Sequence, residues 1–90
     1  MSVIAVKIKV MPDSPDTNID EIKVNVEKIL GAQNIQNPNF EIQPIAFGLK
    51  AWIILFGWPE DKELDDLEEE LRKIPNVSSV QVVDIRRAIG

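Results

Sequence analysis

Apolar and polar residues alternate along four segments of the chain, a period of two that is typical of β-strands. Residues 3–11, VIAVKIKVM, alternate most clearly and predict a strand with one buried side. Residues 40–44, FEIQP, alternate up to a proline, which favours a strand end or an edge strand. Residues 49–58, LKAWIILFGW, are apolar on nearly both faces and predict an interior strand. Residues 77–85, VSSVQVVDI, predict a fourth strand.

Two further segments carry apolar residues at helical spacing. Residues 18–30 have apolar side chains at positions 19, 22, 26, 29 and 30, which predicts a first helix. Thr17, three residues before Asp20, resembles an N-cap, and Gly31 lies where a glycine commonly ends a helix. Residues 60–74, EDKELDDLEEELRKI, predict an amphipathic second helix. Its first turn is acidic and its last turn is basic, as the helix dipole favours.

The resulting order, βαββαβ, predicts an α+β fold of the ferredoxin-like type. Two right-handed crossovers place both helices on one face of a four-stranded antiparallel sheet and leave the opposite face uncovered. Ninety residues suffice for one compact core, so we expect a single domain over residues 1–90. Because this fold hosts many unrelated functions, the order of elements alone assigns none of them.

The composition excludes several kinds of catalytic and metal site. The chain has no Cys, His or Tyr, so a thiolate nucleophile, a disulfide, a zinc-finger site and a histidine base are impossible. The carboxylates are concentrated around the leucine stripe of the second helix, which a solvated helix face explains. Neither a calcium-binding loop nor a glycine-rich phosphate loop occurs. We therefore expect no catalytic residue, no metal and no cofactor, hence a protein that is not an enzyme.

The net charge of −5 argues against direct binding of nucleic acid, which relies on clustered basic residues. Trp52, Phe56 and Trp58 share one face of the third strand, where they either pack against the helices or stack on bases, and the acidic charge favours the core. The longest uncharged apolar run, AWIILFGW, is too short to span a bilayer. We expect a monomeric protein without a membrane partner. We also expect a cytoplasmic protein, because the lack of cysteine fits a reducing compartment.

The segment PIAFGLK, residues 44–50, places a large apolar ring in a predicted turn. One interpretation is that Phe47 folds back over the end of the sheet and closes the core. The other is that Phe47 is an exposed anchor for a partner, held between two rigid strands. Gly48 supports either, because glycine adopts backbone conformations that other residues avoid. Lys50 adds one positive charge at this end of the predicted sheet.

Three motifs together resemble the guanine nucleotide exchange domains of translation elongation factor 1-beta, in particular the archaeal form. They are PIAFGLK at residues 44–50, the acid- and leucine-rich helix followed by the valine-rich strand, and VVDIRRAIG at residues 82–90. The resemblance covers essentially the whole chain. It implies a ferredoxin-like exchange factor that binds the GTPase elongation factor 1-alpha and accelerates GDP release and GTP reloading. It also implies that Phe47, flanked by Ala46 and Gly48, enters a hydrophobic pocket of the GTPase.

The carboxyl terminus departs from the eukaryotic members of this family, which end in a lysine-bearing tail that reaches toward the magnesium and phosphate region of the GTPase. This chain ends in RRAIG. Either Arg86 and Arg87 approach the same region, or they are solvated terminal charges. The alternative function is a small-molecule regulatory module of the ACT type, which shares only the order of elements. An acylphosphatase-like enzyme would need a glycine-rich anion loop with an arginine, which this chain lacks.

Overall fold

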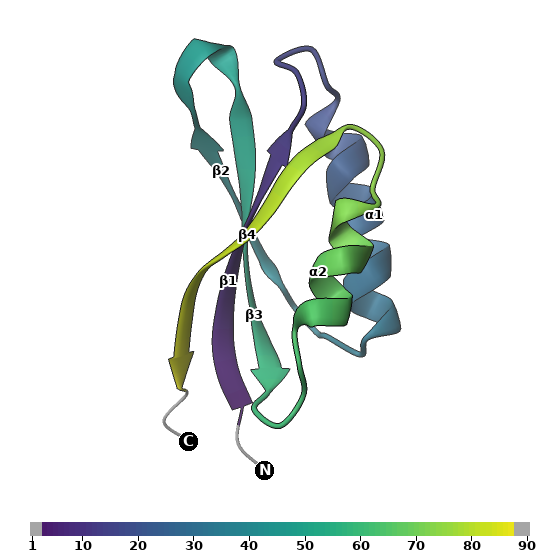
Figure 1. Cartoon of the computed structure of the whole chain (residues 1–90), viewed down its shortest axis with the longest axis vertical. Coiled ribbons are helices and arrows are strands. Elements are labelled where there is room, and N and C mark those ends of the chain that lie inside the picture. The colour runs from purple at the N-terminus through teal and green to yellow at the C-terminus, as the bar shows by residue number, and fades with distance from the viewer. Residues whose placement is uncertain (1–2, 88–90) are drawn as a thin grey trace.

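The computed structural model describes residues 3–87 and consists of one sheet and two helices (Figure 1). Its elements follow the predicted βαββαβ order: β1 (Val3–Pro12), α1 (Ile19–Ala32), β2 (Asn39–Pro44), the 3-10 turn η1 (Ala46–Gly48), β3 (Lys50–Pro59), α2 (Asp65–Arg72) and β4 (Val77–Arg87). The strands lie in the order β2-β3-β1-β4, and every neighbouring pair is antiparallel. The predicted α+β, ferredoxin-like fold is therefore confirmed.

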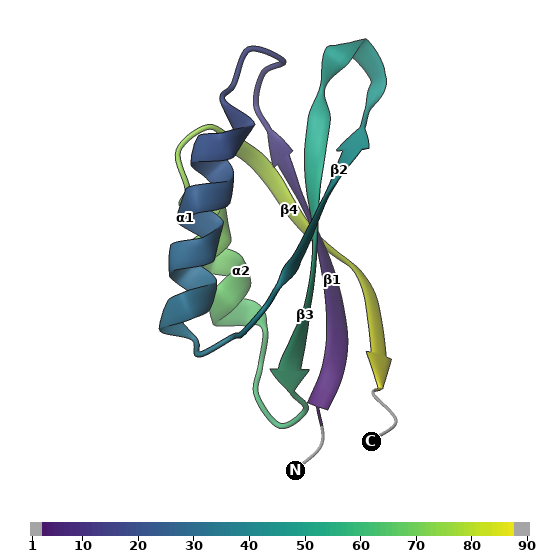
Figure 2. The same ribbon diagram turned by 180° about the vertical axis from the view of Figure 1, so that it is seen from behind.

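Both helices cover the same face of the sheet, because each crossover connection returns to that face (Figures 1 and 2). β3 lies between β1 and β2, which splits the first βαβ unit. The β2–β3 hairpin projects past the helices at one end of the molecule. The first residues of β1 and the last residues of β4 lie at the other end. The two ends of the sheet are therefore separate surfaces.

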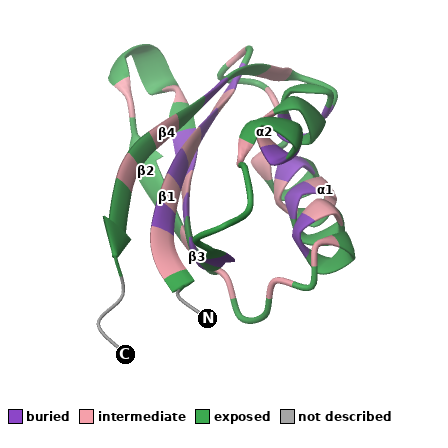
Figure 3. Ribbon diagram, turned by 60° about the horizontal axis from the view of Figure 1, so that its bottom comes forward, coloured by how far each residue is buried: buried purple, intermediate pink, exposed green. Residues whose placement is uncertain are grey.

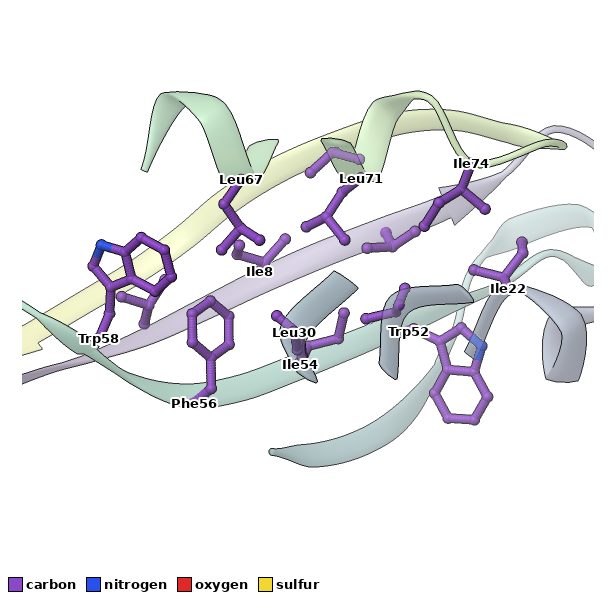
Figure 4. Close-up of a cluster of buried hydrophobic side chains, with 14 residues drawn as sticks. Ile8, Ile22, Leu30, Trp52, Ile54, Phe56, Trp58, Leu67, Leu71 and Ile74 are labelled. Carbon is purple, nitrogen blue, oxygen red and sulfur yellow. The ribbon is translucent and has the colours of Figure 1, made fainter. Parts of the chain in front are cut away.

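The core lies between the helices and one face of the sheet (Figure 4). Alternate residues of β1 and β3 point into it, as the strand pattern predicts, together with one stripe from each helix. Trp52, Phe56 and Trp58 are 6%, 4% and 1% exposed, so the core interpretation of these three rings is confirmed. Both indole groups also donate hydrogen bonds, from Trp52 Nε1 to the Ile19 carbonyl at 2.7 Å and from Trp58 Nε1 to the Lys62 carbonyl at 2.8 Å.

The predicted cap of the first helix is wrong at both ends. Asn18, not Thr17, is the N-cap, and its side-chain oxygen accepts the Asp20 backbone N–H at 3.0 Å. The Thr17 hydroxyl instead donates to Asp13. The helix also runs past Gly31 to Ala32, and Asn34 takes the left-handed conformation with φ 61°. Asparagine can replace glycine there because its short polar side chain tolerates positive φ.

The second helix is shorter than its amphipathic pattern indicates, because residues 60–64 form a turn rather than a helical segment. The Lys62 backbone N–H donates to the Pro59 carbonyl, and the Lys62 carbonyl in turn accepts the Trp58 indole. These contacts reverse the chain after β3 before α2 begins. The predicted apolar stripe is nevertheless buried where expected, at Leu67 and Leu71 within α2 and at Ile74 just beyond it.

Candidate functional site

Phe47 lies in the turn between β2 and β3 and is 93% exposed, whereas the other exposed large apolar side chains of residues 3–87 reach at most 51%. The hypothesis that its ring closes the core is therefore wrong. The ring is exposed, as the alternative interpretation requires, while its role as an anchor for a partner stays a prediction. The residues on both sides, Ala46 and Gly48, are exposed as well. Leaving such a ring in water forgoes about 1.5–3 kcal/mol of burial free energy. Figure 3 shows the tip of this hairpin as an exposed segment with intermediate residues on both sides.

The backbone of the turn holds the ring in a defined place. Phe47 has φ 64° and ψ 31°, and Gly48 has φ 78°, so two successive residues are left-handed. The Ile45 N–H donates to the Leu49 carbonyl at 2.6 Å, which closes the turn across its base. A left-handed residue other than glycine costs about 1–2 kcal/mol. Exposure and backbone strain thus coincide at Phe47, a combination that clusters at functional sites.

A small hollow of about 200 Å³ lies beside this turn, between the β2–β3 hairpin and the loop that connects β1 to α1. Gly48 and Lys50 line it from the hairpin, and Pro15 and Thr17 line it from the loop. A Cβ atom added to Gly48 would lie 3.9 Å from Pro15 Cβ. Lys50 is exposed at the first position of β3. The sequence pattern did not reveal this loop as a neighbour of Phe47, because the two segments are about thirty residues apart along the chain.

Arg86 and Arg87 are at the opposite end of the sheet from Phe47. They pair with Ala5 and Ile4, and Ile4 also pairs with Trp58 at the far end of β3. Trp58 is eight residues along the strand from Lys50, or about 26 Å at the usual rise of a β-strand. The structure therefore brings Ala46, Phe47, Gly48 and Lys50 together and places the two arginines apart from them.

Each arginine forms an exposed ion pair near the end of β4. Arg86 Nε lies 2.9 Å from Asp84 Oδ2, and Arg87 Nη2 pairs with Glu60 Oε1. Exposed pairs of this kind contribute about 0–1 kcal/mol, so a partner can replace them at little cost. Residues 88–90, which complete the RRAIG terminus, lie outside the described residues.

Within residues 3–87, no group of three or more acidic side chains is placed to hold a metal ion. Over the same residues, neither helix has the length and apolar character needed to cross a bilayer.

Comparison with known proteins gives one consistent family. The family model of the EF-1 guanine nucleotide exchange domain matches residues 5–88. Elongation factor 1-beta of Methanosarcina barkeri is 39% identical over 88 residues, which are 97% of this chain and 99% of that protein. The Methanococcus aeolicus protein of the same name is 37% identical and covers 94% of this chain and 97% of its own length. A Saccharolobus islandicus relative, also named elongation factor 1-beta, is 37% identical with 97% coverage of both chains.

A solved structure, the BLUF protein BlrP1, resembles this chain with a TM-score of 0.60 at 14% identity. This chain is covered completely and corresponds to 57% of the BlrP1 chain. At such low identity the likeness concerns the fold alone. The family match and the near full-length relatives show that this chain belongs to the EF-1 guanine nucleotide exchange domain family.

Proposed function

We propose that this protein binds elongation factor 1-alpha and promotes release of its GDP and reloading with GTP. Family membership supports a nucleotide-exchange role in translation elongation, which is a binding function rather than catalysis by side chains of this chain. It favours this function over an ACT-type regulatory module. The observation that carries the proposal is the exposed ring of Phe47 on a turn with a defined backbone geometry.

Phe47 is suited to act as an anchor in a pocket of the GTPase. Buried aromatic anchors at interfaces cost about 2 kcal/mol or more when they are truncated. The hairpin holds the ring away from its own core, so binding needs no side chain to be withdrawn from the fold. Because the turn is already closed by its own hydrogen bonds, little ordering free energy is spent on binding. Ala46 and Gly48 are small and leave space around the ring, while Lys50 can meet an acidic group beside the pocket.

Nucleotide exchange follows when the factor binds two states of the GTPase with different affinities. A factor that binds the nucleotide-free GTPase more tightly than the GDP-bound form must weaken GDP binding by the same ratio. A difference of about 4 kcal/mol corresponds to roughly a thousandfold loss of nucleotide affinity while the complex lasts. Inserting the Phe47 ring stabilises the empty form of the GTPase. GTP then binds and displaces the factor.

The arginines cannot act on the same loop of the partner as the ring, since they lie about 26 Å away along the sheet. We propose that Arg86 and Arg87 form a second contact with the GTPase at the other end of the molecule. The exposed ion pair of Arg87 with Glu60 can exchange for a contact with the partner. Arg86 can keep its bond to Asp84 through Nε and meet the partner with its remaining guanidinium N–H groups. The partner would then be held at both ends of the sheet.

Replacement of Phe47 by alanine tests the proposal. We expect Phe47→Ala to slow GDP release from elongation factor 1-alpha about 30-fold or more, equivalent to about 2 kcal/mol. The melting temperature should change by less than about 4 °C, because the ring makes little contact with the core. Release of a fluorescent GDP analogue, followed with and without the factor, measures the rate.

The matched control is Val24→Ala, which truncates an exposed apolar side chain on α1, away from the hairpin. This variant should promote exchange as well as the unchanged protein. An unaltered exchange rate in Phe47→Ala would show that the ring is not the anchor. Failure of the unchanged protein to accelerate release would overturn the proposed function as a whole.

A further inference from the structure

The face of the sheet opposite the helices, here called the open sheet face, contains a second surface suited to a partner. Lys7 and Lys9 of β1 lie at its centre, between Leu55 and Ile53 of β3 on one side and residues of β4 on the other. A hollow of about 480 Å³ extends over both lysines, Ile53 and Glu41. It shares no lining residue with the hollow beside the Phe47 turn.

The two lysines are half-buried and form no ion pair with another described residue. Asp84 is the cross-strand neighbour of Lys7, but its carboxylate pairs with Arg86 instead. Lys7 and Lys9 are two residues apart on one strand, so their Cα atoms are about 7 Å apart. Half-burial is typical of lysines whose aliphatic stem is covered while the ammonium group stays in water.

An apolar rim surrounds these charges. The register of β1 against β4 shifts between Lys7 and Ile8, which leaves Val83 as an extra residue in β4. Val83 is 46% exposed and lines the hollow opposite Ile53. Leu55 is also exposed next to Lys7. The surface therefore combines two adjacent cations with aliphatic side chains on both sides.

The charge distribution indicates what this surface can bind. Eight of the fifteen acidic residues lie in α2 and the turn before it, on the other side of the sheet. The open sheet face has only Glu41 and Asp84 as acidic strand residues, and Asp84 is paired. A protein with net charge −5 thus presents cations at the centre of this face. Such a face attracts an acidic partner and disfavours a second copy stacked on it, which would bring four lysines together.

We infer that the open sheet face binds an acidic segment of elongation factor 1-alpha, with carboxylates that meet Lys7 and Lys9 and an aliphatic side chain that fills the hollow beside Val83. This inference rests on the proposed function. A rigid partner that contacts Phe47 at one end and Arg86 at the other must lie along one face of the molecule. Arg86 is in register with Ala5 on the open sheet face, and the helices cover the other face, so a partner that reaches Arg86 along the sheet lies over the open sheet face.

Charge reversal tests the inference with a matched control. Each Lys→Glu change lowers the net charge by 2, so Lys7→Glu/Lys9→Glu and Lys28→Glu/Lys73→Glu both change it from −5 to −9. Lys28 and Lys73 are exposed on the helical side of the sheet. We expect the open-face variant to bind nucleotide-free elongation factor 1-alpha about 30-fold more weakly or worse at about 0.1 M salt. The control should stay within about threefold of the unchanged protein. Titration calorimetry gives the dissociation constants.

A milder variant, Lys7→Gln/Lys9→Gln, tests the same contact in case the charge-reversed variant misfolds. Circular dichroism checks the fold of all variants. It should bind about fivefold more weakly and lose much of the salt dependence of binding. If the unchanged protein binds and exchanges nucleotide while both open-face variants match the control, the inference is overturned and the proposed function stands. If the unchanged protein does not bind the GTPase, both the inference and the proposed function are overturned. Binding of polyuridine RNA that depends on these lysines, with GTPase binding unaffected by their replacement, would assign the face to nucleic acid and overturn the inference.

Discussion

At the scale of single residues, Phe47 combines a highly exposed, large apolar side chain with a positive φ. Among residues 3–87, the other non-glycine residues with positive φ are Asn34, Asn37 and Asn76, and asparagine is a residue type that tolerates this conformation well. Phe47 has the same conformation with a large side chain and is also the most exposed of the large apolar residues described. Neither property stabilises the fold. Both are consistent with a ring that is buried only when a partner is bound.

Replacement of Gly48 and of Gly31 by alanine should change the free energy of unfolding in opposite directions. Gly48→Ala has ordinary space for its Cβ but places alanine at φ 78°, so we expect a loss of about 1 kcal/mol in the free energy of unfolding. Gly31→Ala lies within α1 with nothing near its Cβ, so it should gain about 0.5–1 kcal/mol. Urea unfolding measures both. A stable Gly48→Ala variant would contradict the strained geometry of the turn.

At the scale of elements, the β2–β3 hairpin is anchored to the fold, because one of its strands is an inner strand of the sheet. β3 pairs with β1 along Val10 to Val3 and with β2 along its first residues, and it also supplies three core aromatic rings. Phe40 of β2 packs edge-on against Trp52, with ring centroids 5.8 Å apart. The turn thus connects two strands that are packed against the core. A functional side chain is positioned more precisely when packed elements support it, which suits an exposed ring that acts as an anchor.

The corrected N-cap of α1 gives a prediction at this scale. Asn18→Ala removes the side-chain acceptor of the Asp20 N–H and should lower the free energy of unfolding by about 1 kcal/mol. Thr17→Ala loses only an exposed hydrogen bond to Asp13 and should cost less, about 0.5 kcal/mol or below. Chemical denaturation of the two variants compares them directly. A larger loss in Thr17→Ala would reinstate Thr17 as the cap.

At the scale of the whole molecule, the domain is elongated, with principal extents of 42 × 23 × 20 Å. The Phe47 turn and the Arg86–Arg87 pair lie toward opposite ends of the long axis (Figure 1). Two contacts so far apart share no neighbouring side chains and should contribute independently to binding. The shape therefore favours a partner that is held at two separate points.

Independence of the two ends can be measured with a mutant cycle. We expect the binding losses of Phe47→Ala and of Arg86→Ala/Arg87→Ala to add within about 0.5 kcal/mol in the combined variant. Dissociation constants for nucleotide-free elongation factor 1-alpha, obtained by calorimetry, supply the four corners of the cycle. A coupling above about 1 kcal/mol would argue against two separate contacts, and no loss from the arginine variant would remove the second contact.

Much of the fold could be predicted because its signals are local. Alternation over residues 3–11 placed Val6, Ile8 and Val10 in the core, and helical spacing in α2 placed Leu67 and Leu71 there. Helix ends were predicted less well, since neighbouring side chains compete for the same backbone groups. Asn18 rather than Thr17 made the capping bond, and the turn at Lys62 shortened α2.

The sequence by itself determined the order of elements, the buried faces and the position of an aromatic ring in a turn, because periodicity and turn residues act over a few neighbours. Only the tertiary structure decided that Phe47 faces water, since that depends on whether the core has room for another ring. It alone placed Arg86 and Arg87 at the far end of the sheet and put Lys7, Lys9 and Val83 on one face. Those relations arise from strand pairing between segments distant along the chain, and no local pattern encodes them.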